Sequence, residues 1–298
     1  IGSKVHTGWL QTNTPCSWFG VTCEHGNVTY LRLENNGLNG NIPDEIGNLT
    51  NLKLLRLIEN QLQGAIPETL GNLVNLIHLD MRSNQLTSLP VAIGNLTNLQ
   101  GLSLHNNLLT SLPSQIGSLK KLQGIDLSWN PLETLPTEFG QLTQMQTLRL
   151  HHTELQSIPE WLFDFTQLQE LFISSNPLLT GQLPQPFEKF TELKSFYFDG
   201  TNLCEPQDAA FQAWLNAIPN LTRTNIACAP EIKEFKTLIL INRQQLANLH
   251  GGSAADQVMS KLKTFAAHSA VSGIIAEAEN DAAVAAAYAA RGTVYENK

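Results

Sequence analysis

The sequence lacks the short motifs that enzymes use to hold phosphate, metal or an activated nucleophile. It contains no glycine-rich phosphate loop, no H-E-x-x-H, no G-x-S-x-G and no C-x-x-C. Positive charge is also scarce, because 18 Lys and Arg face 26 Asp and Glu, giving a formal net charge of -8. A phosphate-binding surface needs clustered Lys and Arg. We therefore expect no catalytic residues, no cofactor and no nucleic-acid partner.

Long apolar runs and cysteines are rare as well. No run approaches the roughly 18 uninterrupted apolar residues of a membrane span, so we expect no membrane-spanning segment. Only four cysteines occur, and none lies between Cys23 and Cys204. Four cysteines allow three pairings. The pairing that closes each end locally joins Cys16 to Cys23 and Cys204 to Cys228. The alternative is four free thiols. Because disulfides form in oxidising compartments, we expect a secreted or cell-surface protein.

What fills the sequence instead is a repeat of 23 to 25 residues. Its fixed positions are clear in the unit from Leu99, which reads L-x-x-L-x-L-x-x-N-x-L and continues to a proline. This pattern is typical of a leucine-rich repeat, with one short strand and one return segment per coil. Eight units begin at Val28, Leu52, Leu76, Leu99, Leu122, Met145, Leu168 and Leu193. The prediction is an α/β solenoid, a leucine-rich repeat horseshoe of about eight repeats with disulfide caps.

A solenoid needs atypical units that cover the two ends of its core. Residues 16–23 read CSWFGVTC, which resembles the C-x-W-x-G-V-x-C cap that precedes extracellular leucine-rich repeats of the plant receptor type. The resemblance implies that Trp18 covers the core. At the other end, Phe211, Trp214 and Leu215 share one helical face. We expect an N-terminal cap over 1–27, repeats over 28–203 and a C-terminal cap over 204–228.

Two recurring residues are assigned to the scaffold. An asparagine follows the strand in most units, and its amide can satisfy the backbone of adjacent coils; Thr153 and Thr201 replace it. We expect the turn at Thr153 to be the least well tied internal one. A proline ends the motifs L-x-G-x-I/L-P and L-x-S-L/I-P in the return segments. Its fixed φ suits a turn or a first helical position. The convex side should therefore carry short helical or 3₁₀ turns.

Residues 229–298 have a different pattern. Apolar segments at 238–241 and 271–276 alternate with helical ones at about 253–268 and 281–291, an order that predicts a partial α/β domain with an incomplete βαβα segment. The stretch KTLILINRQQL, together with the residues after it, resembles the start of caspase-like or gingipain-like peptidase domains. Enzymes of that kind use a His and a Cys, and no cysteine follows Cys228, so no catalytic role can be assigned in this stretch.

The remaining candidates lie on the concave strand face, where residues between the inward leucines point outward. Neighbouring strands are about 4.8 Å apart, which gathers aromatic, basic and histidine side chains from adjacent repeats. Exposed aromatics beside arginine are typical of binding hot spots; the alternative is that any solenoid face shows some aromatics. The candidate ligand-binding residues are His105, Asp126, Trp129, Arg149, His151, His152, Phe172 and Tyr197.

A metal site is the other interpretation of the histidines. His105 and His151 are two strands apart, about 9.6 Å at the usual strand spacing, whereas zinc requires its nitrogen ligands about 2.1 Å from one ion. We therefore predict no metal. The favoured function is a non-catalytic module that binds a protein or peptide ligand. The alternatives are the substrate-recognition arm of a secreted cysteine peptidase, whose catalytic part lies beyond this chain, and structural adhesion.

Overall fold

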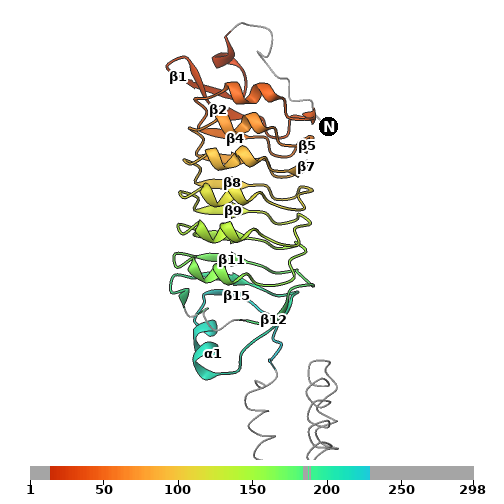
Figure 1. The fold of residues 1–298 in the computed structure, drawn as a ribbon, viewed down its shortest axis with the longest axis vertical. Helices are drawn as coiled ribbons and strands as arrows, with labels where there is room; N and C mark the ends of the chain where they lie inside the picture. The colour runs from red at the N-terminus through yellow and green to blue at the C-terminus, as the bar shows by residue number, and fades with distance from the viewer. Residues whose placement is uncertain (1–13, 184–186, 188, 229–298) are drawn as a thin grey trace, which may run out of the picture. The chain divides into compact units, whose positions relative to one another are not determined.

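The computed structural model describes residues 14–183, 187 and 189–228. The chain divides into two units, 1–229 and 230–298, and the described residues all belong to the first. They form a stack of coils in which each repeat contributes one strand to a common sheet (Figure 1). The predicted leucine-rich repeat solenoid is therefore confirmed. The expected βαβα segment lies outside the described residues.

The large sheet has ten strands in the order β1-β2-β4-β6-β8-β9-β10-β11-β13-β15. The eight predicted strands are all present and pair in parallel. The caps add β1, which is antiparallel to β2, and β15, which is parallel to β13. The strands are β1 (Val21–Glu24), β2 (Asn27–Arg32), β4 (Leu54–Arg56), β6 (His78–Asp80), β8 (Gly101–Ser103), β9 (Gly124–Asp126), β10 (Thr147–Arg149), β11 (Glu170–Phe172), β13 (Ser195–Tyr197) and β15 (Asn220–Thr222).

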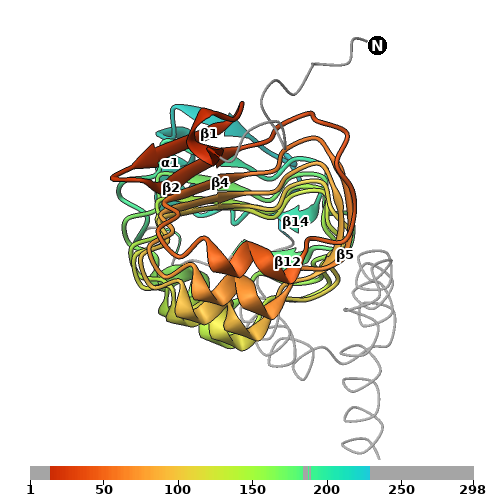
Figure 2. The same cartoon turned by 90° about the horizontal axis from the view of Figure 1, so that it is seen from above.

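The return segments form the other sides of each coil, as the view from above shows (Figure 2). Two small parallel sheets, β3-β5-β7 and β12-β14, follow the strand turns. Short 3₁₀ helices lie opposite the large sheet, as predicted. These elements are β3 (Asn39–Gly40), β5 (Gln61–Ala65), β7 (Gln85–Ser88), β12 (Thr180–Gln182), β14 (Asn202–Cys204), η2 (Asp44–Asn48), η3 (Glu68–Asn72), η4 (Val91–Asn95), η5 (Ser114–Ser118), η6 (Thr137–Gln141) and η7 (Glu160–Asp164). A further 3₁₀ helix, η1 (Pro15–Ser17), precedes the first repeat and contacts β1 and β2.

Proline precedes each of the helices η2 to η7 by one position. Pro43 and Pro113 have extended ψ angles of 149° and 146°, and their carbonyls accept the first hydrogen bond of η2 and η5 from Ile46 and Ile116. The proline is therefore the capping residue, one step earlier than the first helical position. Its fixed φ sets the direction of the chain into the helix.

The core consists of the inward leucines stacked on their counterparts in neighbouring coils. Leu102, Ile125, Leu148 and Leu171 occupy equivalent central strand positions and are almost fully buried. Burial of such apolar area contributes about 25 cal/mol per Å². This stacking holds the strand register, and the register in turn fixes which side chains face outward.

The asparagine ladder ties adjacent coils together behind the strand ends. The amide of Asn107 donates to the carbonyls of Leu104 in its own coil and Met81 in the preceding one, and its oxygen accepts from Leu86 N–H at 3.0 Å. At the sixth repeat Thr153 donates to Leu150 O or Asn176 Oδ1, and neither contact reaches the preceding coil. The ladder is therefore interrupted there.

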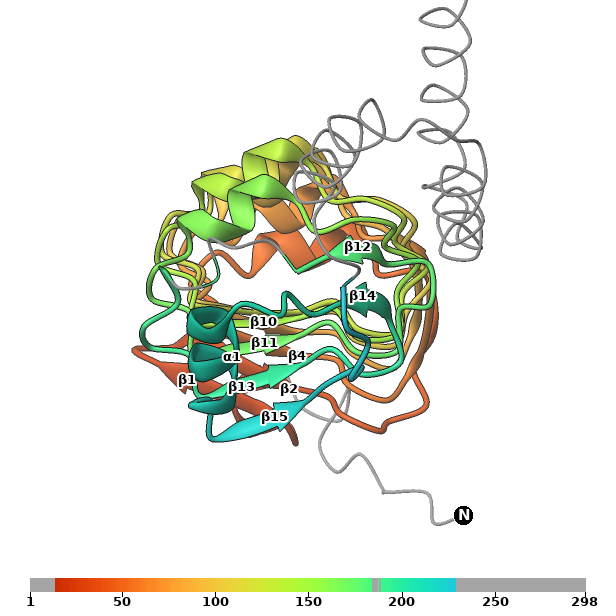
Figure 3. The same cartoon turned by 90° about the horizontal axis from the view of Figure 1, so that it is seen from below.

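Both ends of the array are closed by disulfides, Cys16–Cys23 and Cys204–Cys228, which confirms the local pairing. Helix α1 (Ala209–Asn216) lies at the C-terminal end of the stack (Figure 3). Its Phe211 and Leu215 side chains are buried. Asp208 caps α1 by accepting a hydrogen bond from Phe211 N–H at 2.8 Å. Beside it, the buried Glu205 pairs with Arg223.

Candidate functional site

The outward face of the large sheet and the turns that follow its strands carry all eight candidate residues, which we call the concave patch (His105, Asp126, Trp129, Arg149, His151, His152, Phe172 and Tyr197). Four of them lie on consecutive strands and are direct neighbours in the parallel register: Asp126, Arg149, Phe172 and Tyr197. None of the eight is buried in the core, and Trp129 is 48% exposed. The structure therefore brings the patch together on one surface.

An aromatic ladder forms the C-terminal half of the patch. The rings of Phe172 and Tyr197 stack at 4.5 Å with an interplanar angle of 6°. The guanidinium of Arg149 lies 5.1 Å from the centre of the Phe172 ring, within cation–π distance. Glu170 holds Arg149 from the next strand through a 2.8 Å ion pair. The ladder is thus a planar stack fixed at one end by a salt bridge.

A histidine group forms the other half, where the strands end and the chain turns. The His105 and His151 rings are 5.9 Å apart, and His151 and His152 are 5.8 Å apart. The indole of Trp129 stacks on His152 with centroids 3.7 Å apart and an interplanar angle of 9°. His105 and His151 are closer than the strand spacing suggests, because their side chains converge over the intervening coil.

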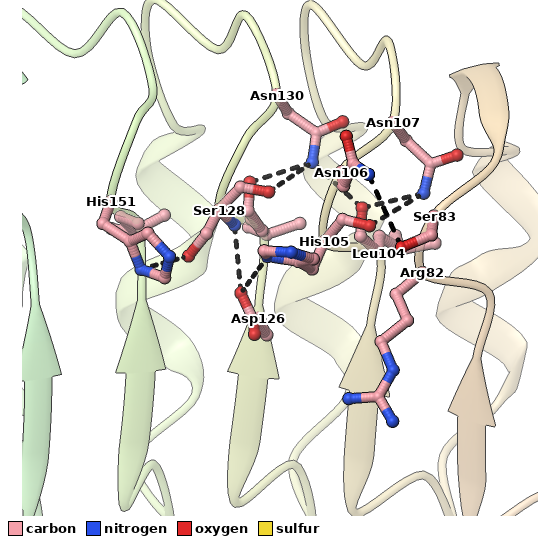
Figure 4. Close-up of polar contacts among 12 residues, drawn as sticks. Arg82, Ser83, Leu104, His105, Asn106, Asn107, Asp126, Ser128, Asn130 and His151 are labelled. Carbon is pink, nitrogen blue, oxygen red and sulfur yellow. Dashed lines mark hydrogen bonds and ion pairs between the residues drawn. The ribbon is translucent and has the colours of Figure 1, made fainter. Parts of the chain in front are cut away.

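Polar contacts fix the orientation of this group (Figure 4). Nδ1 of His151 shares a 2.8 Å hydrogen bond with Ser128 Oγ, and Nδ1 of His105 is 3.8 Å from Asp126 Oδ1. Burial lowers the pKa of His151 below its ordinary value of 6.5. The negative charge of Asp126 opposes that shift, and the positive charges of His105, His152 and Arg149 add to it. His151 is therefore held mainly neutral near pH 7.

The two residues at the turn, Trp129 and His152, have left-handed backbone conformations, with φ of 57° and 52°. The same position is left-handed in the other repeats, from Asn35 to Ser175, and is Gly200 in the last one. This conformation costs a residue with a side chain roughly 1–2 kcal/mol. The coil geometry imposes it at every turn, so the chain places a bulky aromatic where glycine or asparagine would be easier.

Not every residue between the inward leucines is exposed, so part of the expectation for this face is wrong. Leu54, Ile58, Ser128 and Ser195 are buried. Ser128 is covered by the His151 ring to which it is hydrogen bonded. Sequence reasoning also passed over Ser128 and Glu170 as partners of the patch. The one available signal was that Arg149 needs a carboxylate and Glu170 is on the adjacent strand.

The patch lies apart from the cavity on the return side of the coils. The structure has a cavity of about 710 Å³ on the return side, lined in part by Thr137, Trp161 and Asp164, and no patch residue lines it. Small-molecule sites are usually concave and enclosed. Among the described residues, no group of three or more His, Cys, Asp or Glu is placed to hold a metal ion.

Comparison with known proteins identifies the family. A model described as a leucine-rich repeat region matches residues 102–274, more than half of the chain. Models of shorter repeat units match residues 74–116, and residues 27–49 and 51–73. The chain therefore belongs to the leucine-rich repeat family. In the described residues, no helix has the length and apolar character to cross a membrane.

Several plant receptor kinases are similar to this chain. The probable inactive receptor kinase RLK902 of Arabidopsis thaliana is 43% identical over 54 residues, which is 18% of this chain and 8% of that protein. The ectodomain of the Arabidopsis receptor kinase HAESA, in complex with an extended IDA peptide hormone, superimposes with a TM-score of 0.62 at 30% identity and covers 70% of this chain. The plant peptide hormone receptor RGFR1, in complex with RGF2, gives 0.57 at 31% identity over 64%.

This chain spans only about a third of those two receptor chains, 36% and 34%. The resemblance of residues 229–298 to peptidases gains no support. Those residues lie outside the described part of the chain, and a repeat model extends into them as far as residue 274.

Proposed function

We propose that the chain is a non-catalytic extracellular recognition module that binds a peptide or an extended protein segment across the concave patch. The observation that carries the proposal is the preformed aromatic ladder of Phe172 and Tyr197, clamped by Arg149 and continued by the histidine group and Trp129. Aromatic and arginine side chains contribute most of the binding energy at protein interfaces. Rigid rings also lose little entropy when a ligand binds.

The ligand class follows from the shape of the surface and from the similar proteins. Four patch residues lie on consecutive strands about 4.8 Å apart, so an extended chain that crosses the strands can contact all of them. The similar ectodomains of HAESA and RGFR1 are in complex with the IDA peptide hormone and RGF2, which supports a peptide ligand for this chain. The two disulfides favour an extracellular location.

The test compares two patch variants with a matched control. A partner is first isolated from the native medium on the immobilised chain, and its dissociation constant is then measured for each variant. Trp129→Ala and Phe172→Ala should each weaken binding by more than about 1 kcal/mol, a factor of about five. Val91→Ala removes an exposed apolar side chain from η4, on the other side of the coil, and should have no effect. Equal affinities for all three variants would reject the concave patch as the binding site.

A further inference from the structure

The histidine group defines the chemistry of the ligand more closely, and this step rests on the proposed function. His105, His151 and His152 come from the fourth and sixth repeats, and their rings lie within 6 Å of a neighbouring ring. Histidine is the side chain that ordinarily changes charge between about pH 5 and 8. Each of these three imidazoles adds one positive charge to the surface when it is protonated.

The charged groups that face these rings are mostly paired with one another. Arg82 and Asp80 form an ion pair of 3.6 Å on the N-terminal side, and Arg149 and Glu170 form one of 2.8 Å on the C-terminal side. Asp126 remains, and the only cationic partner found for it among the described residues is His105. With neutral imidazoles the group therefore carries one negative charge.

Full protonation of the three histidines reverses the sign of this surface and leaves it with two net positive charges. Imidazolium groups about 6 Å apart repel one another, so the protein alone resists this state. A bound anion removes the repulsion, and by linkage its affinity and the protonation of the group must favour each other.

Two buried nitrogens beside the group have no hydrogen-bond partner within the described residues. They are Arg149 Nε and His105 Nδ1. Arg149 Nε can only donate, and His105 Nδ1 donates when the ring is protonated. The nearby acceptor Asp126 Oδ1 already receives the Ser128 N–H at 3.1 Å.

We propose that the ligand presents a carboxylate-bearing acidic segment to the imidazoles of His105, His151 and His152, and that its binding takes up protons. The acidic segment lies beside the stacked Trp129–His152 pair, and the rest of the ligand continues along the aromatic ladder. Each proton taken up makes binding up to about tenfold tighter per unit decrease in pH. A basic segment at the same place would show the opposite dependence.

The probe is a hexa-aspartate peptide, because its carboxyls stay ionised above about pH 5. Binding to the full chain is measured by calorimetry at pH 7.5 and pH 5.5 at constant ionic strength, in two buffers of different ionisation enthalpy that report proton uptake directly. We expect at least tenfold tighter binding at pH 5.5, with net uptake of one proton or more. A hexa-lysine peptide should bind no more tightly at pH 5.5 than at pH 7.5.

Two variants locate the effect. The double variant His105→Gln with His151→Gln should lose the pH dependence, whereas His78→Gln, which changes an exposed histidine of β6 outside the group, should keep it. Circular dichroism at both pH values confirms that each variant is folded. Absent binding at pH 5.5, equal affinity at both pH values, or a pH dependence retained by the double variant would each overturn the proposal. The binding function itself is decided separately, by the Phe172→Ala comparison.

Discussion

Replacing Asn107 by alanine tests the ladder that sets the register of the patch. The Asn107 amide is buried and bridges two coils, and its oxygen is the acceptor for the N–H of Leu86 at 3.0 Å. In the variant this buried N–H has no acceptor, which costs about 1–3 kcal/mol. The carbonyls of Met81 and Leu104 keep a second donor from the neighbouring ladder asparagines. Losing the Asn107 hydrogen bonds to these two carbonyls therefore adds only about 1 kcal/mol to the destabilisation.

The expected destabilisation is thus about 2–4 kcal/mol, measured by urea unfolding of the full chain followed by circular dichroism. Asn75→Ala is the matched control, because the exposed Asn75 amide makes one hydrogen bond, to Thr50 O at 2.9 Å. It should cost less than about 1 kcal/mol. If Asn107→Ala costs no more than Asn75→Ala, the ladder does not hold the coils in register.

Three further changes test individual positions. Thr153→Asn should leave stability unchanged or raise it by up to about 1 kcal/mol. The N–H of Leu132 donates to Asn130 O within its own turn, and the oxygen of the new amide can accept it instead. A clear fall in the urea midpoint would contradict this. Trp129→Gly should be about 1 kcal/mol more stable than Trp129→Ala, since glycine adopts the left-handed conformation freely; equal stabilities would contradict it. Because burial lowers the folded-state pKa of His151, the unfolded chain binds more protons, and stability should fall as the pH drops through about 6.5. His151→Gln should flatten that slope in unfolding titrations, and an unchanged slope would count against the assignment.

The fold could be predicted in most respects because one rule repeats along the chain. Leucines at fixed intervals can be buried together only if each unit forms one coil, and this rule placed all eight repeat strands. It did not reveal β1 and β15, since the caps do not follow the repeat. It also did not reveal the left-handed turns: Glu59 and Trp129 are not residue types that favour that conformation, and the coil imposes it on them.

The candidate site could be predicted as a surface but not as a set of contacts. The period of two residues along each strand assigned Arg149, Phe172 and Tyr197 to one face, and the register confirms it. Strand spacing alone separated His105 from His151 by about 9.6 Å, whereas the rings converge to 5.9 Å. Side-chain direction at the turn decides such contacts, and the repeat pattern carries no information about it.

Site-specific photo-crosslinking tests the central claim most directly. A photoreactive phenylalanine analogue is placed at Phe172 in the ladder, and in a second variant at Val91 on η4. With the isolated partner present, we predict a crosslinked product from position 172 and none from position 91. A product from position 91 alone, or from neither position while the partner stays bound, would contradict binding across the concave patch.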